Sequence, residues 1–448
     1  MVMKMREFLC NKLGFVDVET PTLFRRTPGG AREFVVPTKI PGKFYCLPQS
    51  PQQFKQLLMV GGIDRYMQIA KCYRDEGAKT DRQPEFTQVD IEMSFVTQED
   101  IMDVIEGLLV NSWPKESGVL KTPFPRMTYE DAMRQYGIDK PDTRFEMKIQ
   151  EVTDIFQGQS VPVFAKALAT PGCSIHALNI KTGQKHLSNK DIEKLQAFAK
   201  ESEAELNLIP IKMKEDLSLQ GSMAKFLSTD TRSRLITHLG MEPGDLVFLS
   251  AGETYATCAL LGRVRLESTN SFDEEERRKL QDPSALNFLW VYDFPLFLPK
   301  EDGTEGLESA HHPFTAPQPG QEELLYTHPE KVQGQHYDLV LNGTEIGGGS
   351  IRIHNSQMQR YVLEEILKED SSQLNHLLQA LDSGCPPHGG IALGLDRLVA
   401  IACQANSIRD VIAFPKTSVG RDIMSDAPAR ISAEEQNYYH IKVTDDGT

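Results

Sequence analysis

Several features that would assign this chain to a special class of protein are missing from its sequence. It contains no run of 18 apolar residues, so no segment is long enough to cross a membrane as a helix, and we expect no membrane partner. The N-terminal stretch MVMKMREFLCNKLGF lacks the apolar core of a secretory signal peptide. The seven cysteines include no CxxC pair, which argues against zinc and disulfide frameworks and favours a reducing compartment.

An excess of positive charge is also absent. The chain carries 48 basic and 63 acidic residues, a formal net charge of −15. This balance argues against a protein that holds nucleic acid by its bulk charge, although it leaves room for an RNA bound by a local patch. The 448 residues are 40% apolar and 25% charged, which is an ordinary globular composition with enough length for two or three domains.

The pattern of predicted strands and helices divides the chain into three parts. Residues 1–125 and 284–448 alternate strand-like and helix-like stretches, and they contain the candidate catalytic and binding residues. Residues 126–283 carry amphipathic pieces without a catalytic constellation, which favours an inserted or appended domain with a binding or structural role. In this middle part Ser188 is expected to cap a helix.

Besides the helix near the C-terminus described below, helices are expected at four places outside the middle part. An amphipathic helix over 1–13 has no cap before it, so the chain is expected to begin inside a domain. A second helix should start near Ser50–Pro51, because serine caps helices and proline suits their first turn. Further helices are predicted near 98–112 and 357–381.

The stretch CYRDEGAKTDRQPEF, residues 72–86, packs seven charged side chains between two predicted strands. Side chains alternate along a strand. One face of the predicted hairpin therefore carries Gln68, Ala70, Cys72, Arg74 and Glu76 on the first strand, and Phe86, Gln88, Asp90 and Glu92 on the second. The opposite face carries Thr87, Val89, Ile91 and Met93 and suits a core. The alternation indicates a ligand surface, and a charged turn kept for solubility is the alternative.

A second hairpin is predicted around Asn342-Gly343, a strong signal for a two-residue turn. Its register places Asp338 and Glu345 on one face as diagonal neighbours. Two such carboxylates suit Mg²⁺, which takes one or two carboxylates together with phosphate oxygens; two solvated acids are the alternative. Arg352 lies an odd number of residues beyond Glu345, and a bulge at the intervening glycines would bring both to one side.

Near the C-terminus, GGIALGLDRLVAIA reads as a buried strand that leads into a helix. Arg397 falls in the first helical turn, where exposed amides and a guanidinium attract anions. An arginine that caps the surface is the alternative interpretation.

Taken in order, these motifs resemble those of class II aminoacyl-tRNA synthetases. GFVDVETPTL is similar to motif 1, YRDE with RQPEFTQVD to motif 2, and GIALGLDRLVA to motif 3. LPQSPQQFKQLLM, HHPFT, NGTEIGGGSIRIH and RDVIAFPKT narrow the resemblance to the bacterial-type aspartyl-tRNA synthetases, a family that includes mitochondrial enzymes. The resemblance covers essentially the whole chain.

The resemblance implies an α+β fold, with a class II catalytic core whose mixed, mostly antiparallel sheet is flanked by helices. It assigns residues 1–125 and 284–448 to the core and 126–283 to an inserted α+β domain of the GAD type. It also implies that an N-terminal anticodon-binding β-barrel is absent from this chain. We therefore expect activation of L-aspartate with ATP, and weak charging of tRNA(Asp) at its 3′ end.

The resemblance also assigns roles to residues. Arg74 and Arg397 would be catalytic. The residues expected to bind ATP are Arg74, Asp75, Glu76, Gln83, Phe86, Glu345, Gly394, Leu395, Asp396 and Arg397. The residues expected to bind aspartate are Ser50, Gln52, Lys55, Arg74, Gln88, Asp90, His311, His312 and Arg352, with Arg352 binding the side-chain carboxylate bidentately. Asp338 and Glu345 would hold Mg²⁺, while Lys79, Asp81 and Arg82 would meet the tRNA acceptor end or the phosphates.

Some expectations depend on where this chain departs from the family. Gly29 stands where many members have a glutamate, a variant that favours a mitochondrial form. The mitochondrial matrix is thus the expected location, with the cytoplasm as alternative.

The resemblance also implies a homodimer through the motif 1 region. The alternatives are an asparaginyl or non-discriminating synthetase, and a dimerising or regulatory fragment without productive catalysis. Arg352 with Lys55 favours aspartate, because an amide needs one donor and one acceptor rather than two cations.

Overall fold

The computed structural model describes residues 1–27, 31–76, 81–158, 161, 164–201, 206–300 and 302–444, so Gly29 and Lys79 lie outside the described residues. Contacts within the chain divide it into two compact units. Unit 1 comprises Met1–Pro125, Tyr292–Leu339 and Glu345–Thr448; unit 2 comprises Arg126–Val291 and Val340–Thr344. Unit 2 starts at the first residue of the predicted insert, and its main segment ends eight residues later than predicted, at Val291 rather than 283.

The main sheet has eight strands in the order β1-β4-β5-β17-β16-β15-β12-β6. These are Val16–Asp17 (β1), Arg65–Tyr73 (β4), Glu85–Ser94 (β5), His388–Gly394 (β17), Thr344–Ile351 (β16), His336–Leu341 (β15), Phe288–Tyr292 (β12) and Arg126–Thr128 (β6). β1 runs parallel to β4, whereas β4, β5, β17 and β16 pair antiparallel in succession. A mixed, mostly antiparallel sheet with flanking helices confirms the predicted α+β class.

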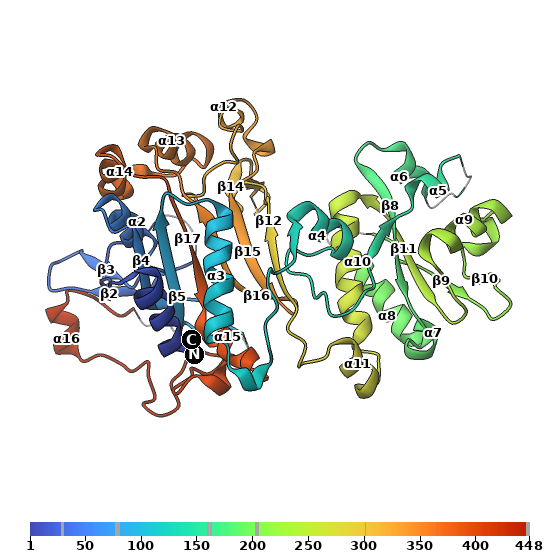
Figure 1. Ribbon diagram of the computed structural model, residues 1–448, viewed down its shortest axis with the longest axis horizontal. Coiled ribbons are helices and arrows are strands. Elements are labelled where there is room, and N and C mark those ends of the chain that lie inside the picture. The colour runs from blue at the N-terminus through green and yellow to red at the C-terminus, as the bar shows by residue number, and fades with distance from the viewer. Residues whose placement is uncertain are drawn as a thin grey trace. The chain divides into compact units, whose positions relative to one another are not determined.

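Helices of unit 1 pack around this sheet (Figure 1). They are Val2–Arg6 (α1), the π-helix Glu7–Lys12 (η1), Gln52–Val60 (α2), Gln98–Ser112 (α3), Leu324–Thr327 (α12), Ser356–Tyr361 (α13), the π-helix Val362–Ile366 (η6), Asn375–Asp382 (α14), Leu395–Ala402 (α15) and Ala433–Tyr438 (α16). Short 3₁₀ turns cover Lys115–Ser117, Pro329–Lys331, Ser371–Leu374 and Ile408–Val411. Two small ribbons pair Val35–Pro37 (β2) with Phe44–Cys46 (β3), and Phe297–Pro299 (β13) with Leu307–Ser309 (β14).

Most predicted helices are confirmed, and one is wrong. α2 begins at Gln52, close to the predicted start, but Pro51 is its N-cap and no side chain caps it, so the expected serine cap is wrong. The helix expected over 1–13 continues from α1 into the π-helix η1, and α3 spans the predicted 98–112 with a capping box between Thr97 and Asp100. The single helix expected near 357–381 is broken into four pieces. Lys368 adopts a positive φ of 56°, which ends helical geometry, and the Asp370 side chain accepts the Ser372 amide to start a new turn.

Unit 2 has its own five-stranded sheet, in the order β10-β9-β11-β8-β7, whose pairs are antiparallel. Its strands are Ile149–Glu151 (β7), Cys173–Ile180 (β8), Ile209–Met213 (β9), Leu219–Gln220 (β10) and Leu246–Glu253 (β11). Its helices are Tyr129–Tyr136 (α4), Thr153–Phe156 (α5), Ala165–Ala169 (α6), Gly183–His186 (α7), Asn189–Lys200 (α8), Thr229–Leu239 (α9), Thr254–Thr269 (α10) and Glu274–Leu280 (α11), with a 3₁₀ turn at Ala224–Phe226. Ser188 caps α8 through a capping box with Asp191, as predicted.

The β4–β5 hairpin has the predicted arrangement. Cys72 pairs with Phe86 and Gln68 pairs with Asp90, so the polar side chains of both strands share one face. The other face of β5 is apolar: Val89 and Ile91 are fully buried, and Met93 is nearly so. The apolar face anchors the hairpin in the core and leaves the polar face available for a ligand.

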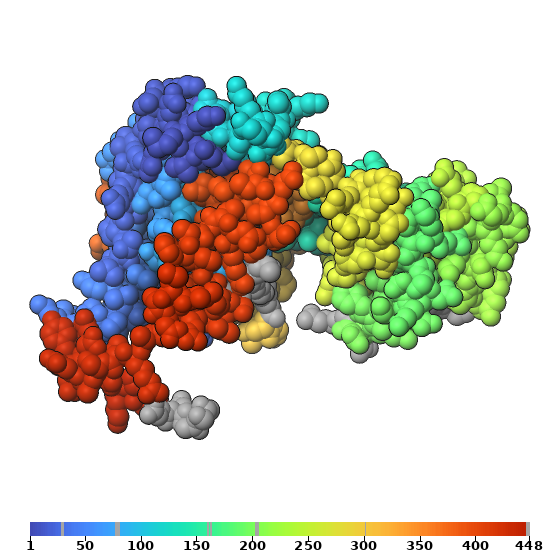
Figure 2. Space-filling view, turned by 90° about the horizontal axis from the view of Figure 1, so that it is seen from below, coloured from blue at the N-terminus to red at the C-terminus, as the bar shows by residue number. Residues whose placement is uncertain are grey.

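The turn between β15 and β16 is the predicted Asn342-Gly343 pair, with positive φ at both residues. The strand over His388–Gly394 leads directly into α15, so Arg397 lies in its first turn, also as predicted. The segment that follows α15 lies on the surface in Figure 2, coloured red. None of the described helices is both long and apolar enough to cross a membrane, and the seven cysteines are free thiols.

Candidate active site

A cavity of about 260 Å³ opens on the polar face of the main sheet within unit 1. Its walls come from α2, β4, β5, β16, β17 and α15, and from the loop that carries two histidines. Sixteen of the residues predicted to bind a ligand line it: Ser50, Gln52, Lys55, Arg74, Glu76, Gln83, Phe86, Gln88, Asp90, His311, His312, Glu345, Arg352, Gly394, Asp396 and Arg397. Residues from three distant parts of the chain therefore meet at one place.

Three predicted site residues do not line the cavity. Asp75 is exposed, and its backbone amide donates to the Arg32 carbonyl, because successive residues of an extended strand point to opposite sides. Leu395 is buried at the start of α15. Asp338 lies behind Gly348: a Cβ built on this glycine would approach Asp338 Oδ1 to 2.4 Å.

Four buried charged side chains form a network at the floor of the cavity: Lys55, Asp90 and Arg352 line it, and Glu92 contacts both cations without lining it. Lys55 Nζ lies 2.5 Å from Asp90 Oδ1 and 3.1 Å from Glu92 Oε2, and Arg352 Nε lies 3.0 Å from Glu92 Oε1. Each of the four is at most 2% exposed. Each cation therefore contacts a carboxylate, which is the arrangement that makes buried charge tolerable.

The pKa values of the two floor carboxylates, Asp90 and Glu92, are shifted in opposite directions. Burial alone would raise the pKa of Glu92, but Arg352 and Lys55 outweigh it and lower that pKa to about 2. Burial raises the pKa of Asp90, and the charge of Lys55 offsets this only in part. Glu92 is thus a permanent anion at neutral pH, and it holds the two cations in place.

Glu92 changes how Arg352 can meet a ligand. Arg352 donates from Nε and Nη2 to the two oxygens of Glu92, at 3.0 and 3.3 Å, and from Nη1 to Ser350 Oγ at 2.8 Å. The Nε–Nη2 edge of the guanidinium is therefore occupied by the protein. Nη2 also makes a long contact of 3.5 Å to the Gly390 carbonyl, so a bidentate ligand would have to use the remaining N–H of Nη1 and displace that contact at Nη2.

Three buried polar atoms around the cavity have no hydrogen-bond partner among the described residues: Gln52 Nε2, Arg74 Nε and Asp90 Oδ2. Buried polar groups are nearly always paired in native proteins, so unpaired ones in a cavity point to a polar ligand. The three atoms supply two donors and one acceptor, which suits a ligand that carries both acidic and ammonium groups.

The other end of the cavity combines an aromatic ring with arginines. The Arg74 guanidinium lies over the Phe86 ring, 5.1 Å from its centre. Arg397 donates from Nη1 to the Glu345 carbonyl and lies 3.9 Å from Asp81. Stacked and forked cations of this kind suit a base and its phosphates.

Asp396 and Gln83 use their polar atoms within the protein. The Thr87 amide donates to Asp396 Oδ2 at 2.8 Å, which ties the start of α15 to β5. Gln83 donates from Nε2 to the Lys416 carbonyl at 3.1 Å, and its Oε1 accepts from the Lys416 amide at 2.7 Å. Gln83 therefore fastens the segment after β4 to the chain beyond α15, in addition to lining the cavity.

His311 and His312 reach the cavity from the loop after β14, where His311 is exposed and His312 is half-buried. Desolvation by the surrounding atoms, together with the positive charge of Arg352 and Lys55, lowers the pKa of each histidine well below its usual value. This lowering favours the neutral form of both rings in the free protein.

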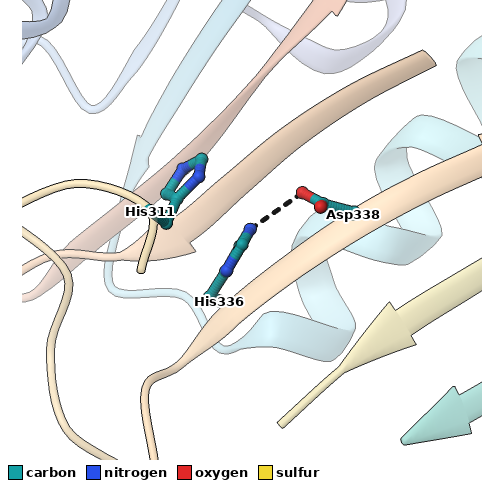
Figure 3. A group of neighbouring side chains, drawn as sticks. All are labelled: His311, His336 and Asp338. Atoms are coloured by element: carbon teal, nitrogen blue, oxygen red, sulfur yellow. Dashed lines mark hydrogen bonds and ion pairs between the residues drawn. The ribbon is translucent and has the colours of Figure 1, made fainter. Parts of the chain in front are cut away.

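Figure 3 shows His311 beside two residues of β15. His336 Nε2 donates to Asp338 Oδ1 at 2.8 Å, and the His336 ring stacks on His311 with centres 3.9 Å apart. The ligand atoms of His311, His336 and Asp338 all lie within 4.8 Å of one another. His336 is a residue that the sequence analysis missed, because a lone histidine on a buried strand carries no signal of its contacts.

Other residues were given no role in the predicted site. Alternation placed Glu92 on the polar face of β5, but nothing in the sequence showed its pairing with Lys55 and Arg352. Thr87, Ile346, Gly347, Gly348, Ala392 and Ile408 line the cavity without a recognisable chemical signature. Glu345 and Arg352 do line one cavity, but the bulge expected at the intervening glycines is not found, because Gly347–Ile351 pair with β17 in regular register.

Comparison with known proteins identifies the family. Residues 1–418 match the family model described as tRNA synthetases class II (D, K and N). The chain is similar to "Aspartate--tRNA ligase, mitochondrial" of Rattus norvegicus, with 56% identity over 444 residues, which is 99% of this chain and 68% of that protein. It is also similar to the protein of the same name in Mus musculus, with 57% identity over 443 residues, 99% of this chain and 68% of the relative.

The chain is also similar to a bacterial protein. "Aspartate--tRNA(Asp/Asn) ligase" of Opitutus terrae is 45% identical over 434 residues, 96% of this chain and 72% of that protein. The chain thus spans about two thirds of the length of the two mammalian relatives. Because the family match covers most of the chain and these identities are high, the chain belongs to the class II tRNA synthetases of the D, K and N group.

Proposed function

We propose that the protein is an aspartate–tRNA ligase, which activates L-aspartate with ATP and transfers the aspartyl group to the 3′ end of tRNA(Asp). The observation that carries this proposal is the buried Lys55–Arg352 pair, held by Asp90 and Glu92 at the floor of the cavity. The names and high identity of the relatives point to the same activity.

The charges of the cavity floor, taken together with Arg74 beside it, favour aspartate over asparagine. Three cationic side chains, Lys55, Arg74 and Arg352, face two anionic ones, Asp90 and Glu92, which leaves one positive charge. Aspartate carries a net charge of about −1 at neutral pH, because its two carboxylates outweigh its ammonium group. Aspartate therefore neutralises the pocket, whereas the asparagine zwitterion would leave the positive charge buried and uncompensated.

The ligand atoms of aspartate have matching partners. The free Oδ2 of Asp90 would accept from the ammonium, with Ser50, Gln52 and Gln88 beside it. Arg352 through Nη1 and Nη2, together with Lys55, would hold the side-chain carboxylate. Arg74 would hold the α-carboxylate, and its unpaired Nε is one donor available for that contact.

ATP fits the opposite end of the cavity. Phe86 would stack on the adenine ring, with Glu76 and Gln83 near the base or its phosphates. Arg397, in the first turn of α15, would bind the γ-phosphate end, and its long contact to Asp81 is easily exchanged for a phosphate. Asp396 and Gly394 line this end and are proposed to bind ATP there, and Asp396 also ties the start of α15 to β5.

Mg²⁺ is proposed as the companion of ATP. Glu345 lines the cavity, and Asp338 lies just behind Gly348, whose missing side chain leaves room at Asp338 Oδ1. Carboxylate oxygens are the ligands that Mg²⁺ takes together with phosphates, so the residues fit the ion. Mg²⁺ would neutralise phosphate charge there.

The chemistry follows from this arrangement. The aspartate α-carboxylate attacks the α-phosphorus of ATP and pyrophosphate leaves; a hydroxyl at the tRNA 3′ end then attacks the aspartyl carbonyl, and AMP leaves. Several anions crowd together in the first step, so the residues act mainly by positioning and by stabilising charge. Arg74 is the central group, because it would contact both the α-carboxylate and the α-phosphate.

The wider setting follows from the resemblance of the motifs to the family. A homodimer through the segment around β1, contact of Asp81 and Arg82 with the tRNA acceptor end or the phosphates, and residence in the mitochondrial matrix are proposed on that basis. The names of the mammalian relatives support the mitochondrial location.

The test is aspartate-dependent ATP–pyrophosphate exchange by the purified chain, with asparagine as the competing substrate. We expect exchange with aspartate and little with asparagine. No exchange by folded protein would refute the enzyme, and equal exchange with asparagine would refute the specificity.

The substitution Arg352→Leu tests whether aspartate and ATP bind at opposite ends of the cavity, as assigned above. It should abolish aspartate activation and leave ATP binding intact. Arg360→Leu, which removes an exposed arginine paired with Glu364, is the matched control and should behave like the parent protein. Loss of ATP binding in Arg352→Leu would contradict the role given to Arg352.

A further inference from the structure

His336 occupies a position between the two ends of the cavity without lining it. It starts β15, is 4% exposed, and lies next to the loop histidine His311 on one side and Asp338 on the other (Figure 3). The two neighbours belong to different parts of the proposed site. His311 is a candidate aspartate contact, and Asp338 is a candidate Mg²⁺ ligand.

The faces of the His336 ring are both covered by aromatic rings. Phe294 stacks on it with centres 4.0 Å apart and planes 28° apart, and His311 stacks with centres 3.9 Å apart and planes 22° apart. His311 lies in a loop with no helix or strand of its own, and it is exposed. The stack therefore gives the loop histidine a fixed surface to rest on, supported from behind by a buried phenylalanine.

The edge of the same ring makes a different contact. His336 Nε2 donates to Asp338 Oδ1 at 2.8 Å, between alternate residues of one strand that share a face. A Cβ on Gly348 would approach this same Oδ1 to 2.4 Å and His311 Cε1 to 3.4 Å. His336 thus holds the Asp338 carboxylate by a hydrogen bond, and Gly348 leaves the space that this carboxylate occupies.

The stacking argues against a metal chelate formed by His311, His336 and Asp338. Imidazole lone pairs lie in the ring plane, and two nearly parallel rings direct them along separate, nearly parallel planes. A single ion cannot lie in both planes without a rotation of one ring. The arrangement fits support of the neighbours better than capture of an ion.

We propose that His336 is a positioning residue that holds His311 through its ring face and Asp338 through its Nε2–H group. This inference rests on the proposed function, since it assigns His311 to the aspartate end and Asp338 to the Mg²⁺ end. The two contacts use different parts of one side chain, so they can be removed separately.

Two variants separate the contacts. His336→Phe keeps a flat ring between Phe294 and His311 and removes the donor to Asp338. His336→Gln keeps an N–H donor at a comparable reach and removes the ring. The same substitutions at His328, an exposed histidine that also faces a carboxylate, that of Glu330, are the matched controls.

Two binding measurements report separately on the aspartate site and on the Mg²⁺–ATP site. L-Aspartate binding is measured by calorimetry without ATP and Mg²⁺, and binding of a non-hydrolysable ATP analogue is measured as a function of Mg²⁺ concentration. His336→Phe should leave the aspartate Kd within about twofold and raise the Mg²⁺ requirement about fivefold to tenfold. His336→Gln should raise the aspartate Kd about threefold to tenfold and leave the Mg²⁺ requirement within about twofold.

The split between the two readouts is decisive. If His336 had a merely structural role, each variant would both raise the aspartate Kd and raise the Mg²⁺ requirement, and this result would overturn the proposal. The proposal is also overturned if neither variant changes either quantity. Thermal unfolding of each variant shows whether a shared loss is due to poor folding. If the parent protein fails to bind aspartate, the proposed function fails; if it binds and both variants match it, only the role of His336 fails.

Discussion

Arg352 and Glu92 are joined by two hydrogen bonds, from Nε to Oε1 at 3.0 Å and from Nη2 to Oε2 at 3.3 Å, although 260 residues separate them in sequence. Lys55 reaches the same carboxylate at 3.1 Å. Glu92 therefore organises both cations that would recognise the side chain of aspartate, and it does so without lining the cavity.

Substitution Glu92→Gln should abolish most aspartate binding while ATP binding remains. It removes the charge partner of two buried cations, and breaking such a pair costs about 3–5 kcal/mol. Calorimetric titration with L-aspartate measures the loss. Glu365→Gln, which removes an exposed acid paired with Lys368, is the control and should bind as the parent does. Unchanged aspartate affinity in Glu92→Gln would contradict the role of Glu92.

The acid stability of unit 1 should depend on Glu92. Its pKa of about 2 lies below the usual value of 4.5, so the stability from the ionised form is present above pH 4.5 and is lost as the pH falls through 4.5 toward 2. The shift corresponds to about 3 kcal/mol over that window. Trp113 lies in unit 1 and Trp290 in unit 2, and these are the two tryptophans of the chain. Denaturant unfolding at several pH values, followed by Trp113 fluorescence in a Trp290→Phe background, should show a steeper pH dependence for the parent than for the Glu92→Gln variant. Parallel curves would refute this prediction.

Gly348→Ala should disturb the Mg²⁺ end of the site. The new Cβ would lie 2.4 Å from Asp338 Oδ1, so the carboxylate must move, whereas the contact to His311 at 3.4 Å is ordinary. We expect a fold close to that of the parent, aspartate binding within about twofold, and an increase of about tenfold in the Mg²⁺ concentration that supports exchange. Gly61→Ala, where the new Cβ near the end of α2 would meet only ordinary contacts at 3.4 Å, is the control. A parent-like Mg²⁺ dependence in Gly348→Ala would show that Asp338 does not contribute.

Gln83→Ala should loosen the segment around Lys416. Both polar atoms of the Gln83 amide bond to the Lys416 backbone, so its loss leaves that N–H and C=O without these partners. Hydrogen–deuterium exchange of the Lys416 amide should accelerate about tenfold, with a higher KM for ATP. Gln184→Ala in unit 2, which removes a similar clamp on the Met213 and Asp245 carbonyls, should leave this segment unchanged. A raised KM without faster exchange would favour direct contact between Gln83 and ATP.

Local rules in the sequence were sufficient for much of the fold and for part of the site. The period of two along β4 and β5 placed Arg74, Phe86 and Asp90 on one face, because a strand must alternate its side chains. The Asn342-Gly343 turn and the Ser188 cap were equally readable, since each depends on the backbone conformation or hydrogen bonding of a few neighbouring residues. The break in the helix expected near 357–381 was missed, because the apolar pattern continued past Lys368 while the backbone changed conformation there.

Only the tertiary structure decided which partners these side chains meet. Glu92 was visible on the polar face of β5, but its pairing with Lys55 and Arg352 depends on α2 and the end of β16 being brought beside that strand. The stack of Phe294, His336 and His311 depends in the same way on a loop and a strand that are joined by packing alone. Contacts between distant residues arise from packing of the whole core, which no short stretch encodes. The sequence by itself therefore determined the family, the sheet and most residues of the cavity, while the fold determined how their charges and rings are held.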